Sequence, residues 1–179
     1  MIKWLLVAFL IGMVLLLWRS TASANSNLPK TGDAAPGFSL PDQHGKLRTS
    51  AEFRGKWLVL YFYPRDDTPG CTEQACAFRD DLHRLTALGA EVVGVSVDDT
   101  ASHQDFAKKY SLPFPLLADA QGELARRYGS LRDFGLIRFA RRNTFLIDPQ
   151  GRVAKVYLSA NTSRNSQEVI DDLKKLTAK

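Results

Sequence analysis

Tyr61–Arg79, with the sequence YFYPRDDTPGCTEQACAFR, is the stretch that determines the predicted fold. It holds both cysteines of the 179-residue chain, Cys71 and Cys76. The apolar run Trp57–Tyr63 contains four aromatic residues and one β-branched valine, which predicts a buried strand. After Cys71, apolar residues recur at spacings of three and four, which predicts a helix that closes near Gly89. The apolar residues with this spacing are Ala75, Phe78, Leu82 and Leu85.

Cys71 is placed by this pattern at the start of a helix, just after the turn Thr68-Pro69-Gly70. The free N–H groups of a first helical turn and the helix macrodipole favour the thiolate over the thiol. Because the thiolate is the nucleophilic form of cysteine, this position predicts a reactive sulfur at Cys71.

The spacing of five between Cys71 and Cys76 is informative as well. In a regular helix, residues i and i+5 have Cα atoms roughly 8.6 Å apart, whereas a disulfide tolerates at most about 7 Å. The two thiols can share one helix, but they can be joined only if the first turns unwind. This favours a redox-active pair, and the alternatives are a local structural disulfide or two unrelated core cysteines.

The pattern Pro64-x-x-x-Thr68-x-x-Cys71 is similar to the active-site motif of the peroxiredoxins. The longer run TPGCTEQAC, residues 68–76, followed by Phe78-Arg79-Asp80, resembles the peroxiredoxin Q class, also called the bacterioferritin comigratory protein type. The resemblance covers residues 30–178. It is specific, because a proline, a hydroxyl residue and two cysteines must coincide at fixed offsets after a strand.

The resemblance implies a thiol peroxidase. Cys71 would be the peroxidatic cysteine that peroxide oxidises to a sulfenic acid, and Cys76 would be the resolving cysteine that forms an intramolecular disulfide with it. A thioredoxin-like protein would then reduce the pair by exchange. Thr68 would hold peroxide and thiolate through its hydroxyl, and Pro64 would shield the site from water.

An arginine from a later strand completes the site that the resemblance implies, because a guanidinium stabilises the charge that moves from sulfur to the leaving oxygen. Arg142 is the expected residue, since it lies three positions before Phe145 in a segment similar to the family's arginine-bearing strand. Arg141 is the alternative. Side chains alternate along a strand, so only one of the two is expected to face Cys71.

Three segments are expected along the chain. Residues 1–24 contain Lys3, then fifteen uncharged residues at positions 4–18, then small residues, which is typical of a secretory signal peptide. The alternative is a short N-terminal membrane anchor, although fifteen residues fall short of the ~20 that a spanning helix needs. Either interpretation predicts an exported, periplasmic protein. Residues 25–37 are expected to be a linker, and residues 38–179 a single domain.

Composition limits the choice of partners. Lys3 and Arg19 lie in the first 24 residues, so the formal net charge of +5 falls to +3 for the remainder, which is too small to indicate nucleic-acid binding. No metal or organic cofactor is implied, because the sulfur itself would carry both electrons. An intramolecular cysteine pair makes a monomer sufficient.

The order of predicted elements argues for a layered α/β domain with a mixed sheet. It resembles the thioredoxin fold with peroxiredoxin-type additions, a three-layer domain. Two short apolar segments around the turn at 42–45 predict a hairpin. The remaining predicted strands cover residues 91–97, 112–119, 145–147 and 153–157, and the remaining helices cover 101–110, 121–128 and 166–177.

The three histidines are expected to be structural or solvated. His44 lies in the turn of the hairpin, and His83 and His103 fall on helices among charged neighbours, which predicts surface positions without a metal-binding role.

Six arginines and a single acid, Asp133, fall within residues 126–142. This basic segment is either a solvated loop or a positive field that steers an anionic or polar partner.

Two other functions remain open at this level. An exported thiol:disulfide oxidoreductase of the same fold would carry its cysteines as Cys-x-x-Cys, whereas four residues separate them here. A non-enzymatic binding domain with a structural disulfide would not require the coincidence of proline, hydroxyl and cysteines.

Overall fold

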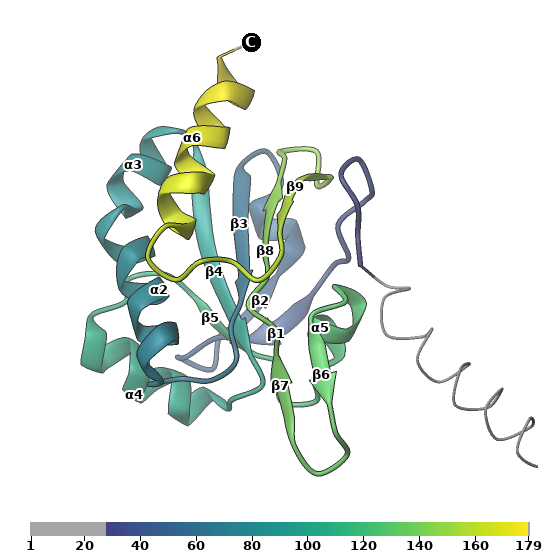
Figure 1. The fold of residues 1–179 in the computed structure, drawn as a ribbon, viewed down its shortest axis with the longest axis vertical. Helices are drawn as coiled ribbons and strands as arrows, with labels where there is room; N and C mark the ends of the chain where they lie inside the picture. The colour runs from purple at the N-terminus through teal and green to yellow at the C-terminus, as the bar shows by residue number, and fades with distance from the viewer. Residues whose placement is uncertain (1–27, 179) are drawn as a thin grey trace, which may run out of the picture.

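The computed structural model describes residues 28–178, and its centre is a five-stranded sheet in the order β5-β4-β3-β8-β9. Strands β3, β4 and β5 are parallel to one another, whereas β8 is antiparallel to both β3 and β9. The predicted layered α/β domain with a mixed sheet is confirmed (Figure 1). The strands are β3 (Trp57–Phe62), β4 (Ala90–Ser96), β5 (Leu116–Ala118), β8 (Thr144–Ile147) and β9 (Val153–Tyr157).

Strand β3 is buried on both faces, and its side chains alternate between two cores. Leu58, Leu60 and Phe62 belong to one apolar cluster, while Val59 and Tyr61 belong to the other. The second of these cores is covered by α2 (Pro69–Asp80), α3 (Leu82–Ala87), α4 (Thr100–Tyr110) and α6 (Asn165–Thr177). The first is covered by the short helices η2 (Ser50–Phe53) and α5 (Glu123–Arg127). The sheet is therefore the middle of three layers.

Several predicted boundaries change in the structure. The single helix predicted to run from Cys71 to Gly89 is wrong in its extent, because α2 and α3 are separated at Asp81, where the backbone leaves helical geometry (φ −90°, ψ 1°). The strand predicted over residues 112–119 is reduced to β5, since Pro113 and Pro115 cannot donate to a strand ladder. The helix predicted at 121–128 is shortened to α5.

The N-terminal part of the described chain is attached to the sheet. Strands β1 (Ser39–Pro41) and β2 (Leu47–Thr49) form the predicted antiparallel hairpin. Within the stretch expected as a linker, the N–H groups of Gly32 and Ala35 donate to the carbonyls of Val153 and Gly151, so these residues belong to the folded domain. The expected signal peptide or anchor lies outside the described residues.

A further hairpin, at residues 131–140, was not predicted. Strands β6 (Leu131–Asp133) and β7 (Arg138–Ala140) pair antiparallel and form a two-stranded sheet of their own within the basic segment. Figure 1 shows this hairpin extending away from the central sheet. Across residues 28–178, none of the helices is both long and apolar enough to traverse a bilayer.

Candidate active site

The site lies where β3 passes into α2. Thr68 is the N-cap of α2 in an extended conformation (φ −90°, ψ 148°), and Pro69 occupies the first helical position, where a missing N–H costs nothing. Cys71 is the third residue of the helix. The first helical hydrogen bond runs from the Thr72 N–H to the Thr68 carbonyl at 2.9 Å. The sulfur is therefore held at the positive end of a helix, as the sequence predicts.

Arg142 meets this sulfur from another part of the chain. Its Nη2 lies 3.4 Å from Sγ of Cys71, a residue that is only 1% exposed. Its Nη1 donates to Oε1 of Gln74 at 2.8 Å and approaches the Gly70 carbonyl at 3.3 Å. Within the described residues the guanidinium is thus bonded to two neutral oxygens and the sulfur, and no carboxylate neutralises its charge. A full positive charge faces the buried sulfur.

A chain of buried amides fixes the position of this arginine. Gln74, which accepts from Arg142, donates through Nε2 to Oδ1 of Asn165 at 2.9 Å. The Thr144 hydroxyl donates to the same oxygen at 2.7 Å. Gln74, Asn165 and Thr144 are all fully buried, and they come from α2, α6 and β8. Because buried polar groups keep their partners, this network holds the guanidinium in one place.

The structure separates the two candidate arginines. Both lie within three residues of the start of β8 at Thr144, but only Arg142 contacts Cys71. The backbone N–H of Arg141 donates to the Ser130 carbonyl at 2.6 Å, and its Nε is buried without a hydrogen-bond partner among residues 28–178.

Cys71 and Cys76 are both free thiols on the continuous helix α2. Cys76 is half-buried, while Cys71 is buried. At their spacing of five, the standard helix places the Cα atoms roughly 8.6 Å apart, beyond the about 7 Å that a disulfide permits. The structure therefore holds a reduced pair that cannot be joined without unwinding the helix.

Thr68 and Pro64 flank the loop that leads into α2, and both are half-buried. The Thr68 hydroxyl donates to the Arg65 carbonyl at 3.1 Å. A hydroxyl that donates one bond keeps lone pairs free to accept another, so it retains hydrogen-bonding capacity beside the start of the helix.

A buried polar network anchors the same loop to α4, and it corrects the prediction for His103. Oδ1 of Asp66 accepts from the Tyr63 hydroxyl at 2.7 Å. Oδ2 of Asp66 accepts from the Ser102 hydroxyl at 2.7 Å and lies 2.7 Å from Nδ1 of His103. The N–H of Asp66 donates to Asp98 at 2.8 Å. His103 is fully buried, so its predicted surface position is wrong.

The protonation of Tyr63 in this network is set by its surroundings. Burial raises the pKa of the Tyr63 hydroxyl, and the adjacent Asp66 carboxylate raises it further, so Tyr63 remains a donor. His44 and His83 are exposed, as predicted.

The supporting residues left only weak signals in the sequence. His103 stands three and four residues before Phe106 and Ala107, the spacing of a buried helical face, and Gln74 stands three residues after Cys71 on the same face. A polar residue at core spacing indicates a buried hydrogen bond, but its partner cannot be read from the pattern. Asn165 carries the same signal, because it stands four residues before the buried Val169 on α6.

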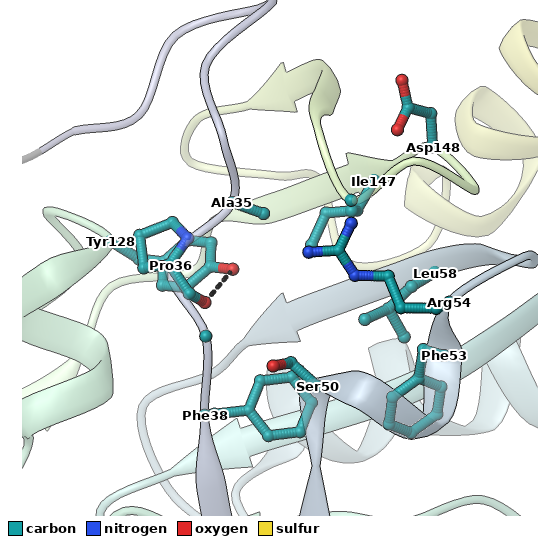
Figure 2. Close-up of a pocket in the computed structure, with 12 residues that line it drawn as sticks. Ala35, Pro36, Phe38, Ser50, Phe53, Arg54, Leu58, Tyr128, Ile147 and Asp148 are labelled. Carbon is teal, nitrogen blue, oxygen red and sulfur yellow. Dashed lines mark hydrogen bonds between the residues drawn. The ribbon is translucent and has the colours of Figure 1, made fainter.

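A separate hollow lies against the other face of the sheet (Figure 2). It is lined by apolar side chains such as Phe38 and Phe53, and Arg54 reaches across it to donate to the Gln150 carbonyl. At one side the Tyr128 hydroxyl donates to the Pro36 carbonyl at 2.9 Å. The residues around Cys71 do not line this hollow, which is distinct from the candidate site.

The fold and the site together define a class of protein. Its members are layered α/β domains in which a cysteine at the start of the helix after the central strand faces a fixed arginine. The family model described as the AhpC/TSA family matches residues 31–156. The chain is 46% identical over 146 residues to the chloroplastic peroxiredoxin Q of Populus jackii, covering 81% of this chain and 66% of that protein. It is 40% identical over 148 residues to the peroxiredoxin bcp of Coxiella burnetii, covering 80% of this chain and 98% of that one.

Solved structures agree with the sequence matches. The peroxidoxin BcpB of Mycobacterium tuberculosis superposes with a TM-score of 0.79 at 34% identity, covering 83% of this chain and 98% of that one. The bacterioferritin comigratory protein of Xanthomonas campestris, described for its alkyl peroxide reduction activity, gives a TM-score of 0.73 at 31% identity, covering 78% and 92%. The thioredoxin-like fold is thereby confirmed.

The chain belongs to the AhpC/TSA family, within its peroxiredoxin Q and bacterioferritin comigratory protein class. It spans 58% to 66% of the length of the first plant relatives that it matches, and nearly the whole of the bacterial one.

Asp66→Asn is expected to lower the free energy of unfolding by roughly 2–3 kcal/mol, because an amide cannot accept from Tyr63, Ser102 and His103 together. Urea unfolding of the reduced protein measures this loss. Asp67→Asn is the matched control. Hydrogen bonds from Lys109 and Tyr110 hold the pKa of the Asp67 carboxyl below its usual range, but this carboxyl is exposed, so its loss is expected to destabilise the protein far less than the loss of Asp66. Equal small losses in both variants would show that the buried network does not anchor the loop.

Proposed function

We propose that this protein is a thiol peroxidase that reduces hydrogen peroxide and organic hydroperoxides through Cys71. The observation that carries the proposal is the contact of 3.4 Å between Nη2 of Arg142 and Sγ of Cys71 at the start of α2. A guanidinium and a helix N-terminus both stabilise negative charge, and the reaction moves such charge from sulfur to the departing oxygen. The alkyl peroxide reduction reported for the Xanthomonas campestris relative supports organic hydroperoxides as substrates.

The proposed cycle has three balanced steps. The Cys71 thiolate attacks one peroxide oxygen, the O–O bond breaks, and a proton completes the alcohol or water that leaves, with Cys71 oxidised to a sulfenic acid. The Cys76 thiol then displaces the sulfenic oxygen as water and forms the Cys71–Cys76 disulfide. A thioredoxin-like protein supplies two thiols, which reduce this disulfide by exchange and become a disulfide themselves.

Each remaining site residue has a place in this proposal. Thr68 holds the peroxide through its hydroxyl, which now donates to Arg65 but can accept from a substrate O–H. Pro64 limits access of water at the loop. Arg142 is the residue that stabilises the charge, because it contacts the sulfur, whereas Arg141 does not contact it.

The second step requires α2 to open at its N-terminal end. In the reduced chain, Cys71 is buried and the two Cα atoms are too far apart for a disulfide. A sulfenic acid adds an oxygen atom to a side chain that is only 1% exposed, and an extra atom in a packed site favours exposure of the turn. The oxidation of Cys71 itself promotes the unwinding that brings it to Cys76.

An exported thiol:disulfide oxidoreductase is the weaker alternative. Its two cysteines would lie in a Cys-x-x-Cys arrangement, whereas here four residues intervene on a continuous helix. The peroxide cycle needs one protomer only, since both cysteines belong to the same chain, and we propose that a monomer is sufficient for activity.

The proposed location is outside the cytoplasm, in a bacterial periplasm. Lys3, the uncharged run at 4–18 and the small residues at 20–24 support export, with cleavage after residue 24 or retention of the run as an anchor.

Mass spectrometry after one equivalent of hydrogen peroxide tests the cycle. The reduced protein is expected to lose two protons as the disulfide forms, Cys76→Ser to accumulate a sulfenic acid that dimedone traps, and Cys71→Ser to remain unmodified. Oxidation of Cys71→Ser at the rate of the parent protein would contradict the assigned roles.

Arg142→Met is expected to reduce the second-order rate constant for peroxide by roughly a hundredfold or more, the usual loss when a charge-stabilising donor is removed. Arg141→Met is the matched control and is expected to change it less than about threefold, because among residues 28–178 no hydrogen bond joins the Arg141 side chain to Cys71 or to the residues that hold Arg142. Stopped-flow measurement on both reduced variants decides between the two arginines, and equal losses would refute the assignment.

Export is tested by expressing the full chain with a C-terminal tag in a Gram-negative host and fractionating the cells. If the signal peptide is cleaved, the periplasmic fraction is expected to contain a protein with the mass of residues 25–179 plus the tag. If the run is an anchor, the membrane fraction is expected to contain the full-length protein. Full-length protein in the cytoplasm would rule out both.

A further inference from the structure

The β6–β7 hairpin presents an apolar tip to solvent. Phe134, Leu136 and Ile137 are 68%, 102% and 62% exposed. They connect the two short strands, and nothing among residues 28–178 covers them. The ring of Phe139 lies 6.0 Å from that of Phe134, and so extends the apolar surface along one strand. Exposed apolar patches of this kind mark contact sites rather than ordinary surface.

The backbone of this tip is largely satisfied within the hairpin. The N–H of Phe134 donates to the Ile137 carbonyl at 3.0 Å, and that of Leu136 to the Phe134 carbonyl at 3.2 Å. The N–H of Gly135 donates to Oδ1 of Asp133 at 2.9 Å. Three of the four N–H groups at the tip therefore have partners already. This removes much of the penalty for moving the tip out of water, where unpaired backbone groups are costly.

Arginines surround the apolar tip. Arg126 and Arg138 share the carboxylate of Asp133, at 3.6 and 3.2 Å. Arg127 and Arg132 are exposed. Arg141 and Arg142 lie beyond β7, and Arg142 contacts Cys71. Without these two, four arginines and one acid give residues 126–140 a net charge of +3. The apolar residues of the tip are suited to the acyl layer of a bilayer, and the arginines behind them are suited to its anionic headgroups.

The described chain begins beside the base of the same hairpin. A Cβ added to Gly129 would lie 3.0 Å from Cα of Leu28, and Leu28 and Leu131 pack against the same core cluster. Nine residues separate Leu28 from the uncharged run that ends at Trp18, and nine residues span up to about 30 Å. The hairpin reaches about 15 Å from its base to its tip. A bilayer that held the uncharged run would thus be within reach of the tip.

We infer that the β6–β7 hairpin is a docking element for an anionic phospholipid bilayer, with Phe134, Leu136 and Ile137 entering the interface and Arg127 and Arg132 contacting headgroups. The tip is too small for a stable protein interface, which buries about 800 Å² on each partner. A second copy of the chain would also have to approach against the same positive charge. The inference does not depend on the peroxidase activity.

A site-specific fluorophore in the full chain tests this inference, because the N-terminal run can bind vesicles by itself. An environment-sensitive nitrobenzoxadiazole group is attached at Leu136→Cys in a chain that also carries Cys71→Ser and Cys76→Ser. The matched control carries the group at His83→Cys, an exposed position on α3. Circular dichroism verifies that both chains are folded.

With phosphatidylcholine vesicles that contain phosphatidylglycerol, the emission at position 136 is expected to rise severalfold and shift to the blue, while the emission at position 83 stays constant. Arg127→Gln with Arg132→Gln is expected to raise the lipid concentration at half-maximal response roughly tenfold to thirtyfold. The inference is overturned by an unchanged signal at position 136, by an equal response to vesicles without phosphatidylglycerol, or by a response to protein concentration alone, which would indicate a second copy.

Discussion

The contact between the Arg142 guanidinium and the buried Cys71 sulfur is the interaction on which the rest of the site depends. It joins a helix start to a residue seventy-one positions later in the chain. A flexible arginine on its own would lose side-chain entropy on being held there. The buried amides of Gln74 and Asn165 supply the geometry that holds it, and they bind α2, α6 and β8 to one another. The fold and the chemistry of the sulfur thus share one set of hydrogen bonds.

The proposed cycle requires two conformations of helix α2. Folded, it presents Cys71 to the arginine and keeps it away from Cys76. Unwound at its first turn, it allows the two sulfurs to meet. The first turn is a suitable place for this change, since helix ends have the fewest internal hydrogen bonds. The Asp66 network lies just before that turn and ties the preceding loop to α4, so opening can remain local.

Much of this could be predicted from the sequence, and the reasons are local. The apolar and aromatic run of β3, the turn at Thr68–Gly70 and the cysteine spacing are short-range signals, and they indicated both the mixed sheet and the position of Cys71. Arg142 was expected through its resemblance to a family motif. Gln74 and Asn165 were missed because their roles depend on a contact between residues ninety-one positions apart. Pairing at that distance is set by the tertiary fold.

His103 and the β6–β7 hairpin were missed for different reasons. His103 has the helical spacing to Phe106 and Ala107 that is typical of a buried face, but its charged and polar neighbours on α4 led to a predicted surface position. The arginines of residues 126–142 suggested a solvated loop, although the apolar residues of the hairpin tip lie among them. In both segments polar and apolar residues alternate irregularly in the sequence. Which side chains are buried and which are exposed is decided by the elements that pack against the segment.

The claim that buried amides position Arg142 against a reactive sulfur is tested most directly by the rate at which reduced Gln74→Met consumes hydrogen peroxide. Gln74 bonds the guanidinium, and methionine fills a similar volume without accepting that bond. A rate roughly a hundredfold below that of the parent chain is expected, since small misplacements of a reacting group have effects of this size. A folded variant with an unchanged rate would contradict the account.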